Sequence, residues 1–237
     1  MLRVNAPDCM TRHSVPMRTS PRIFESRAEA GRLLAEELSR RPLERPVVYA
    51  LPRGGVPVAV EVARRLHAPL DLIFVRKIGA PGHPELALGA IVDGERPLTV
   101  MNEDVARHFR VDSAFLDQAR ASELAELERR RAEYLGGRAS VDPSGRTAIV
   151  VDDGMATGAT MKAALIAVKQ NGAARTCIAV PVAPESTLAE IGAEADIVVC
   201  LDPRRSFLGV GAHYRDFHQL TDAETIGLLR RAWQTPT

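Results

Sequence analysis

The feature that most constrains this chain is a short apolar segment, residues 148–151, that ends in two adjacent carboxylates, Asp152 and Asp153. A turn of small residues with two glycines and two threonines follows at residues 154–160, and then an alanine-rich segment at residues 161–169. An apolar run without alternation is typical of a strand buried on both faces of a parallel sheet. The pattern therefore predicts a buried strand, a phosphate-sized loop and a helix N-terminus.

The turn and the acid pair offer complementary chemistry. The amides of the turn and the helix dipole are suited to holding a phosphate. The acids would lie at the carboxyl end of a strand, where open α/β sheets bind ligands. They could accept hydrogen bonds from hydroxyls or from water on a metal. A sugar phosphate has this combination of groups.

Composition sets the class of protein. A chain of 237 residues, 46% hydrophobic and 26% charged, can bury the core of one α/β domain or of one domain with an insertion. The net charge of +1 gives no field that would attract nucleic acid or a membrane surface. Cys9, Cys177 and Cys200 lie far apart, which argues against disulfides or a zinc site and fits a cytoplasmic protein. No apolar run approaches the ~18 residues of a membrane span.

Strand and helix patterns alternate at the spacing of βαβ units, which predicts an α/β fold with a mostly parallel sheet flanked by helices. We expect strands at residues 47–51, 70–75, 86–92, 97–101, 148–151, 176–182 and 196–201. We expect helices at residues 28–38, with Ser26 as N-cap, and at residues 56–66, 161–169 and 185–193.

Four segments define the expected domain organisation. Residues 1–22 carry arginines and prolines without an apolar core and are predicted to be a disordered tail, not a signal peptide. Residues 23–237 are predicted to form a single domain. Within it, the Gly- and Pro-rich residues 78–88 are predicted to be a flexible loop. Residues 102–140 are predicted to be a helical insertion, either over the sheet or at a dimer contact.

Other phosphate-binding loops fit less well. A Walker A loop requires a lysine where this chain has Ala159, and the glycine spacing differs. No Gly-x-Gly-x-x-Gly follows a strand, so a dinucleotide-binding domain has little support. A receiver domain would need an acceptor aspartate at the end of the next expected strand, residues 176–182, and this chain has none there. An acidic loop that merely caps a helix would need fewer polar residues than this turn contains.

Residues 150–161 resemble the phosphoribosyl-pyrophosphate (PRPP) signature of type I phosphoribosyltransferases. Arg53-Gly54-Gly55 resembles the pyrophosphate loop of that family, and Val75-Arg76-Lys77 resembles the segment before its flexible loop. The resemblance covers residues 45–215 and is closest to a bacterial branch with unassigned acceptors. It implies a Rossmann-like, three-layer fold.

The resemblance also implies roles for individual residues. Asp152 and Asp153 would hold the ribose 2- and 3-hydroxyls and contact Mg²⁺, directly or through water, because PRPP is a diphosphate ester. Those implied to hold the 5-phosphate are Gly154, Met155, Ala156, Thr157, Gly158, Ala159 and Thr160. Those implied to hold pyrophosphate are Arg53, Gly54, Gly55, Arg76 and Lys77. A strained peptide is expected at Arg53, of which a cis bond is one form.

The reaction so implied displaces pyrophosphate from ribose C1 by a nitrogen of an acceptor, often a nucleobase. Lys77 would act on the leaving group, and His83 or Glu85 would move a proton to or from the acceptor. Phe207 and Tyr214 would contact the acceptor base. Closure of the flexible loop would exclude water. The resemblance further implies a homodimer, and the near-neutral charge predicts no nucleic-acid partner.

Departures from the family pattern leave the acceptor open. The hypoxanthine-guanine enzymes carry an acidic residue where this chain has Ala156, although adenine- and uracil-type enzymes share the alanine. The orotate enzymes carry loop lysines, and residues 78–88 contain none. Two other functions remain open: a regulator that senses PRPP without catalysis, and a phosphatase or nucleotidase that uses the same pocket.

We expect Asp153→Asn and Thr157→Ala each to weaken PRPP binding with little change in melting temperature, because both side chains would contact the ligand. Calorimetric titration with PRPP and thermal unfolding of the same samples test this. A large loss of stability with unchanged affinity would show that these positions are structural.

Overall fold

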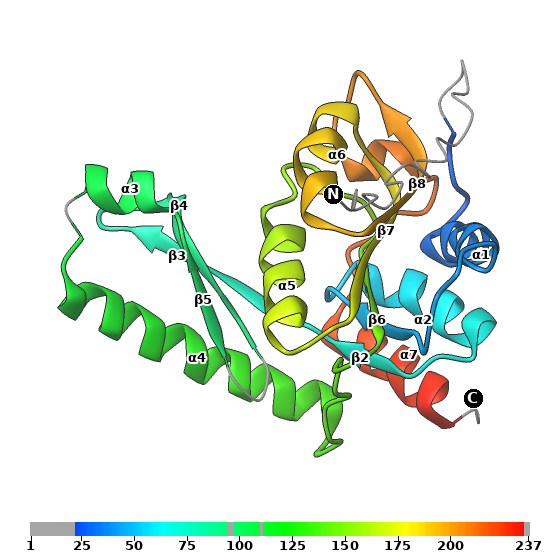
Figure 1. The fold of residues 1–237 in the computed structure, drawn as a ribbon, viewed down its shortest axis with the longest axis horizontal. Helices are drawn as coiled ribbons and strands as arrows, with labels where there is room; N and C mark the ends of the chain where they lie inside the picture. The colour runs from blue at the N-terminus through cyan, green and yellow to red at the C-terminus, as the bar shows by residue number, and fades with distance from the viewer. Residues whose placement is uncertain (1–21, 94–96, 110, 235–237) are drawn as a thin grey trace, which may run out of the picture.

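The computed structural model describes residues 22–93, 97–109 and 111–234 (Figure 1). The helices are α1 (Arg27–Leu38), α2 (Gly55–Leu66), α3 (Glu103–His108), α4 (Ser113–Leu135), α5 (Ala159–Gln170), α6 (Glu185–Ile191) and α7 (Asp222–Gln234), with short 3₁₀ turns η1 (Gly192–Glu194) and η2 (Val210–His213). The strands are β1 (Val47–Ala50), β2 (Leu70–Leu72), β3 (Val75–Ala80), β4 (His83–Val92), β5 (Leu98–Met101), β6 (Thr147–Val151), β7 (Arg175–Pro184) and β8 (Ile197–Arg204).

Five strands form the central sheet in the order β2-β1-β6-β7-β8, and every neighbouring pair is parallel. Helices α1 and α2 pack on one face and α5 on the other, so the apolar strand residues are buried on both sides. The chain leaves β1 toward one face and β6 toward the other. The edge between these two strands is therefore a topological switch point, where open α/β sheets bind ligands. The predicted α/β class is confirmed.

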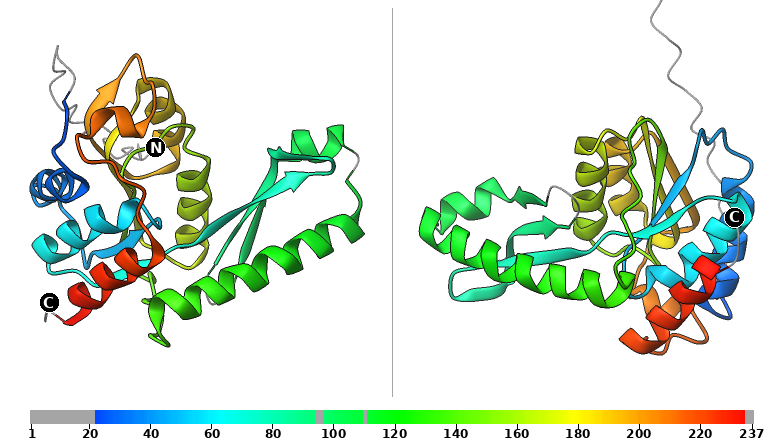
Figure 2. Two further views of the ribbon diagram at one scale, coloured as in Figure 1. Left: turned by 180° about the vertical axis from the view of Figure 1, so that it is seen from behind. Right: turned by 90° about the horizontal axis from the view of Figure 1, so that it is seen from below.

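A second, antiparallel sheet, β3-β4-β5, projects from the central sheet together with α3 and α4 (Figures 1 and 2). We call residues 75–135 the arm. Helix α4 begins after Asp112, whose carboxylate accepts the Phe115 amide, and buries Leu127 and, near its other end, Tyr134, whose ring packs edge-on against Phe74 just before β3. The expected helical insertion at residues 102–140 therefore corresponds to α3 and α4, which cover the small sheet rather than the central one.

The residues of the predicted flexible loop, 78–88, lie in strands and a tight turn rather than in a long loop. These residues form the hairpin of β3 and β4, whose turn lies at Pro81 and Gly82. The paired partner strands supply hydrogen bonds that outweigh the poor strand preference of Gly and Pro. The flexibility of this segment stays a prediction.

A buried ionic cluster joins the arm to the central sheet. Asp93, at the end of β4, accepts the Phe74 amide at 2.7 Å and pairs with Arg131 of α4. Asp71 of β2 accepts the Val141 amide at 2.7 Å and lies 4.0 Å from Arg131. The chain entering the arm at Phe74 and the chain leaving it at Val141 are therefore both held by this one cluster.

The N-terminal end of the described chain pairs with the segment that follows β8. The Phe24 amide donates to the His213 carbonyl at 2.8 Å, and the Arg215 amide donates to the Phe24 carbonyl at 2.8 Å. The Arg22 amide donates to Asp202 at 3.2 Å, so Arg22 belongs to the folded domain rather than to a tail. Residues 1–21, the rest of the predicted tail, lie outside the described residues.

Among the helices of the described ranges, none combines the length and the apolar character needed to cross a bilayer. The cytoplasmic location and the homodimer expected from the sequence stay predictions.

The ionic cluster predicts a pH dependence of stability. Burial raises the pKa of Asp93 from 3.8 to about 6, against the effect of Arg131. In the unfolded chain this carboxyl ionises near its usual pKa, while in the folded protein it holds its proton until about pH 6. Its contribution to the free energy of unfolding therefore falls as pH rises from 4 to 6, by about 3 kcal/mol at ~1.4 kcal/mol per pKa unit.

Thermal unfolding of the wild type and of Asp93→Asn between pH 4 and pH 8 tests this. The melting temperature of the wild type minus that of the variant should be largest at pH 4, decline through pH 6 and stay constant above it. A difference that grows with pH would show that the ion pair with Arg131 lowers the pKa of Asp93 instead.

Candidate functional site

Strand β6 delivers the acid pair to the edge of the sheet, as predicted. Asp152 is half-buried, and Asp153 is buried, with an exposed fraction of 9%. The Asp153 amide donates to the Asp152 carboxylate at 2.9 Å, which fixes the turn at the end of the strand. Taken as a whole residue, Asp152 is more exposed than Asp153.

Asp153 has a cation partner that the sequence did not predict. The Arg27 Nε atom, at the start of α1, donates to Asp153 Oδ2 at 2.7 Å in a buried ion pair. Removing the charge of one partner of such a pair costs ~3 kcal/mol or more, because the other charge is left uncompensated. Asp153→Asn should therefore lower the melting temperature, which corrects the expectation of little change.

The two carboxylates influence each other. Burial and the adjacent Asp153 raise the pKa of Asp152 well above its usual range. Burial also raises the pKa of Asp153, while the Arg27 guanidinium opposes that shift. Hydroxyl donors or a cation at this point would therefore relieve an unfavourable concentration of negative charge.

The turn after β1 packs directly against the acid pair. A Cβ atom on Gly54 would lie 2.2 Å from Asp153 Oδ2, and one on Gly55 would lie 2.6 Å from the Val151 carbonyl. Only glycine fits at such distances. The peptide between Pro52 and Arg53 is cis, in agreement with the expectation for this turn. The structure thus brings the predicted pyrophosphate loop and the predicted ribose site together.

The predicted phosphate loop lies at the N-terminus of α5, next to the acid pair. Ala156, Thr157 and Ala159 are exposed, and the first amides of the helix have no partner within it. Met155 differs from the expectation: its amide donates to the Val182 carbonyl at 3.0 Å and its side chain is buried. An anion would therefore meet the amides after Met155, and Met155 anchors the loop.

Gly158 gives this loop its shape. It has a φ of +72°, and a Cβ atom there would lie 1.7 Å from the Cδ1 atom of Ile191 in α6. Gly154 is equally confined, since its Cβ atom would lie 2.6 Å from Val210. Both positions need glycine because α6 and η2 press on the loop from outside.

Arg53 extends toward α7. Its Nη1 atom lies 3.7 Å from Asp222 Oδ1, and Asp222 also accepts a hydrogen bond from the Tyr134 hydroxyl of α4. The side chain of Arg53 is about one-third exposed. The cis peptide bond joins this residue to Pro52, at the start of the glycine turn. An anion at the turn would therefore compete with Asp222 for this guanidinium.

Arg76 and Lys77 have different surroundings. The Arg76 Nε atom donates to Glu123 of α4 at 2.7 Å, so this side chain joins the arm sheet to its helix and does not reach the glycine turn. Lys77 is exposed, and alternation along β3 places it on the opposite face of the arm sheet from Arg76. The predicted pyrophosphate role of Arg76 is therefore not supported by its contacts, whereas Lys77 keeps an open position.

His83 lies at the far end of the arm. It begins β4 and contacts the Phe109 ring after α3, with ring centres 5.4 Å apart. This end of the arm is remote from the β6–α5 turn (Figure 1). The structure thus does not bring His83 to the site. The side chain of Glu85 lies outside what the structure describes, and its backbone belongs to the same end of β4.

Of the two predicted acceptor contacts, Tyr214 is enclosed. Its exposed fraction is 6%, its hydroxyl donates to the Asp153 carbonyl at 2.6 Å, and its ring contacts Phe24 and Phe217. It supports the acid turn and presents no face to an acceptor. Phe207 is half-buried and stacks on His213, with ring centres 5.5 Å apart.

The donor set fits a magnesium ion that arrives with a phosphate ligand. Mg²⁺ keeps several waters and is usually held by one or two carboxylates together with substrate phosphates. Asp152 supplies such a carboxylate, whereas one oxygen of Asp153 is already bound to Arg27. Within the described residues, no group of three or more His, Cys, Asp or Glu could hold a metal by itself.

Arg27 and Asp222 are the site residues that sequence reasoning missed. Arg27 is the first residue of α1, where the helix dipole favours negative charge over positive charge. Because a positive charge is unfavourable there, the presence of Arg27 was the one local indication in the sequence that this side chain has a carboxylate partner. Asp222 had no comparable signal, because α7 was not among the expected helices.

Comparisons with known proteins agree with this geometry. The family described as "Phosphoribosyl transferase domain" matches residues 22–214. Two Mycobacterium tuberculosis proteins, MT0597 and Rv0571c, carry provisional phosphoribosyl transferase names and are 46% identical over 211 residues. That stretch is 89% of this chain and 47% of theirs, so the chain spans about half the length of these curated relatives.

A solved structure is similar throughout. The crystal structure of TT1426 from Thermus thermophilus is 44% identical, with a TM-score of 0.78. The match covers 88% of this chain and 98% of that one.

The contact between the glycine turn and the acid pair gives a prediction. Gly54→Ala should lower the free energy of unfolding by ~1–3 kcal/mol, because its Cβ atom would overlap a carboxylate that Arg27 holds in place. Gly192→Ala is the matched control: its Cβ atom would lie 3.4 Å from Val198, in ordinary contact. The control should change stability by no more than ~0.5 kcal/mol.

Urea unfolding of both variants measures the difference. Equal stability of Gly54→Ala and the wild type would show that the turn and the acid pair are not in contact in solution.

Proposed function

This chain belongs to the phosphoribosyltransferase family, and from that premise we propose that it transfers the 5-phosphoribosyl group of PRPP to a nitrogen of an acceptor and releases pyrophosphate. The acceptor that we propose is a nucleobase. The family membership supports PRPP as the substrate, and the nucleobase follows only from the resemblance to the family.

One observation carries the proposal. The acid pair, the N-terminus of α5 with its amides unpaired within the helix and the glycine turn after β1 meet at a single edge of the central sheet. PRPP carries hydroxyls, a 5-phosphate and a diphosphate around one sugar ring. Each of these groups would thus have a matching partner within a short distance.

The chain's own residues would chiefly bind and orient. The amides from Ala156 to Thr160 and the Thr157 hydroxyl would hold the 5-phosphate. Asp152 would accept a hydrogen bond from a ribose hydroxyl, and its negative charge would stabilise the positive charge that develops on the ring as the bond at C1 breaks.

The leaving group would bind at the glycine turn. The Gly54 and Gly55 region offers backbone without side chains, and Arg53 would exchange Asp222 for a pyrophosphate oxygen. Lys77 would add a second positive charge once the arm approaches the turn. The arm would also keep water from C1.

Magnesium, when bound, would neutralise diphosphate charge, and Asp152 would hold it directly or through water. Phe207 is the proposed acceptor contact that keeps a partly open position. His83 and Glu85 stay proposals as proton-transfer residues, and they depend on a large movement of the arm toward the site.

Release of pyrophosphate from PRPP tests the proposal. The wild type should release it in the presence of Mg²⁺ and one base from a panel of adenine, hypoxanthine, guanine, uracil and orotate. Thr157→Ala should weaken PRPP binding by ~3–10-fold through the loss of one hydrogen bond. Asp152→Asn should lower the rate of pyrophosphate release as well as PRPP binding, because it removes a charge that acts on the reacting ring.

Ser39→Ala provides the control. It removes an exposed hydroxyl that bonds the Glu36 carbonyl at the end of α1, and its activity should equal that of the wild type. PRPP binding without pyrophosphate release across the panel would favour a sensor over an enzyme. No binding of PRPP at all would reject both.

A further inference from the structure

Arg27 is a buried cation with three well-defined contacts. Its Nε atom lies 2.7 Å from Asp153 Oδ2, and its Nη1 atom donates to the His218 carbonyl at 3.0 Å. The guanidinium carbon lies 4.0 Å from the centre of the Phe217 ring. The exposed fraction of the residue is only 8%. These contacts join α1, the acid turn and the C-terminal segment 214–218.

The bond to Asp153 has a particular geometry. The oxygen that accepts from Arg27 is also the atom nearest to the position of a Cβ on Gly54, at 2.2 Å. This oxygen therefore has protein on two sides and is not available to a ligand. The second oxygen of Asp153 and the carboxylate of the half-buried Asp152 are left to meet a ligand.

The charge of Arg27 matters as much as its position. Two adjacent carboxylates repel each other most strongly where water is excluded, and an opposite charge within hydrogen-bond distance offsets that repulsion. Arg27 thus allows both acids to remain side by side in the turn. A lysine would keep the charge but could not make the same forked set of bonds.

We propose that Arg27 is a positioning residue of the sugar-phosphate site. Its guanidinium fixes Asp153 against the Gly54 turn, joins that carboxylate to segment 214–218, and thereby sets the orientation in which Asp152 meets the ribose hydroxyls. The inference rests on the proposed function for the identity of the ligand, PRPP, and on the structure alone for the contacts.

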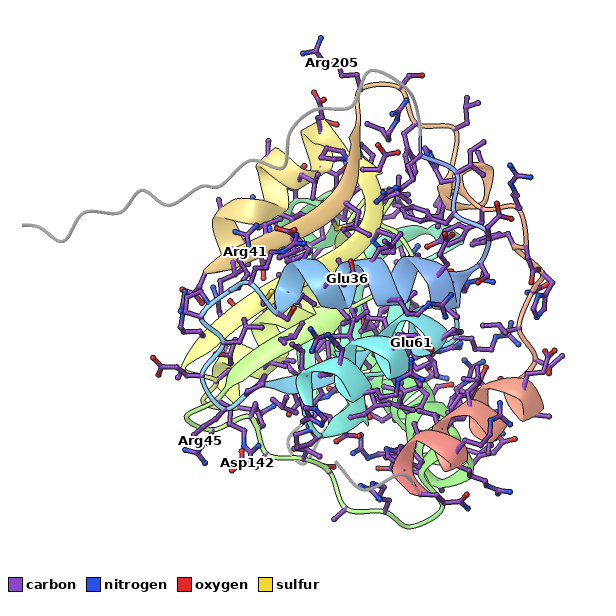
Figure 3. All side chains as sticks on the ribbon, turned by 90° about the vertical axis from the view of Figure 1, so that its right-hand side faces the viewer. Glu36, Arg41, Arg45, Glu61, Asp142 and Arg205 are labelled. Carbon is purple, nitrogen blue, oxygen red and sulfur yellow. The ribbon has the colours of Figure 1, made fainter. Side chains whose placement is uncertain are left out.

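The test compares three variants with the wild type. Arg27→Gln removes the charge, Arg27→Lys keeps it, and Arg41→Gln makes the same change just beyond the other end of α1, where Arg41 pairs with Glu37. Figure 3 labels Arg41 at that end of the helix. For each variant, a temperature is chosen at which hydrogen exchange in β7 is as fast as in the wild type. Hydrogen exchange in the other segments and calorimetric titration with PRPP and Mg²⁺ are then measured at that temperature.

In Arg27→Gln, hydrogen exchange should rise in residues 152–155 and 214–218, and PRPP should bind ~10–100-fold more weakly, as for other residues that orient a ligand-binding group. Arg27→Lys should recover part of the affinity. Arg41→Gln should match the wild type in both measurements. Should Arg27→Gln not fold, Arg27→Lys carries the test, with the same increase in exchange and a smaller loss of affinity expected.

Two results would overturn the inference. One is a folded Arg27 variant that binds PRPP as tightly as the wild type. The other is unchanged exchange in both segments, and this result decides the matter even if the wild type itself fails to bind PRPP. That failure would reject the proposed function separately.

Discussion

Two turns of this fold approach each other so closely that no side chain fits between them. Strands β1 and β6 are neighbours, and the chain leaves them toward opposite faces of the sheet, so residues 52–55 and 152–158 meet at one edge. The contact of Gly54 with Asp153 closes the acid pair on one side and fixes its distance from the glycine turn. Every other contact of the site, from Arg27 to Tyr214, is arranged around this approach.

The sequence predicted those parts of the fold that depend on local patterns. Residues 148–151 form a buried strand because a continuous apolar run is most stable with both faces covered, and the small residues after it can form only a tight turn. The arm was harder to predict. Its hairpin contains Gly and Pro, and it forms strands because β4 pairs on both sides, which is a property of the assembled sheet and not of the segment.

Long-range ion pairs leave the weakest trace in a sequence. Arg27 and Asp153 are 126 positions apart, and nothing in the spacing of either residue connects them. Tyr214 was expected to face a ligand because residues 207–214 resemble a base-stacking segment, yet the same ring can as easily support the acid turn from behind. Three cations of the site and the arm also have carboxylate partners already: Arg27 with Asp153, Arg53 with Asp222 and Arg76 with Glu123. An anionic ligand at the glycine turn would gain the charge of Arg53 only by replacing Asp222.

The pairing of Phe24 with the segment around Tyr214 has a consequence for how the protein is made. The ribosome releases α1 before any strand of the central sheet, whereas residues 214–218 follow every strand of that sheet. Arg27 therefore leaves the exit tunnel long before Asp153, His218 and Phe217 are available to it. Most of the α/β core can assemble during synthesis, but the acid turn acquires its full set of supporting contacts only after residues 214–218 have emerged.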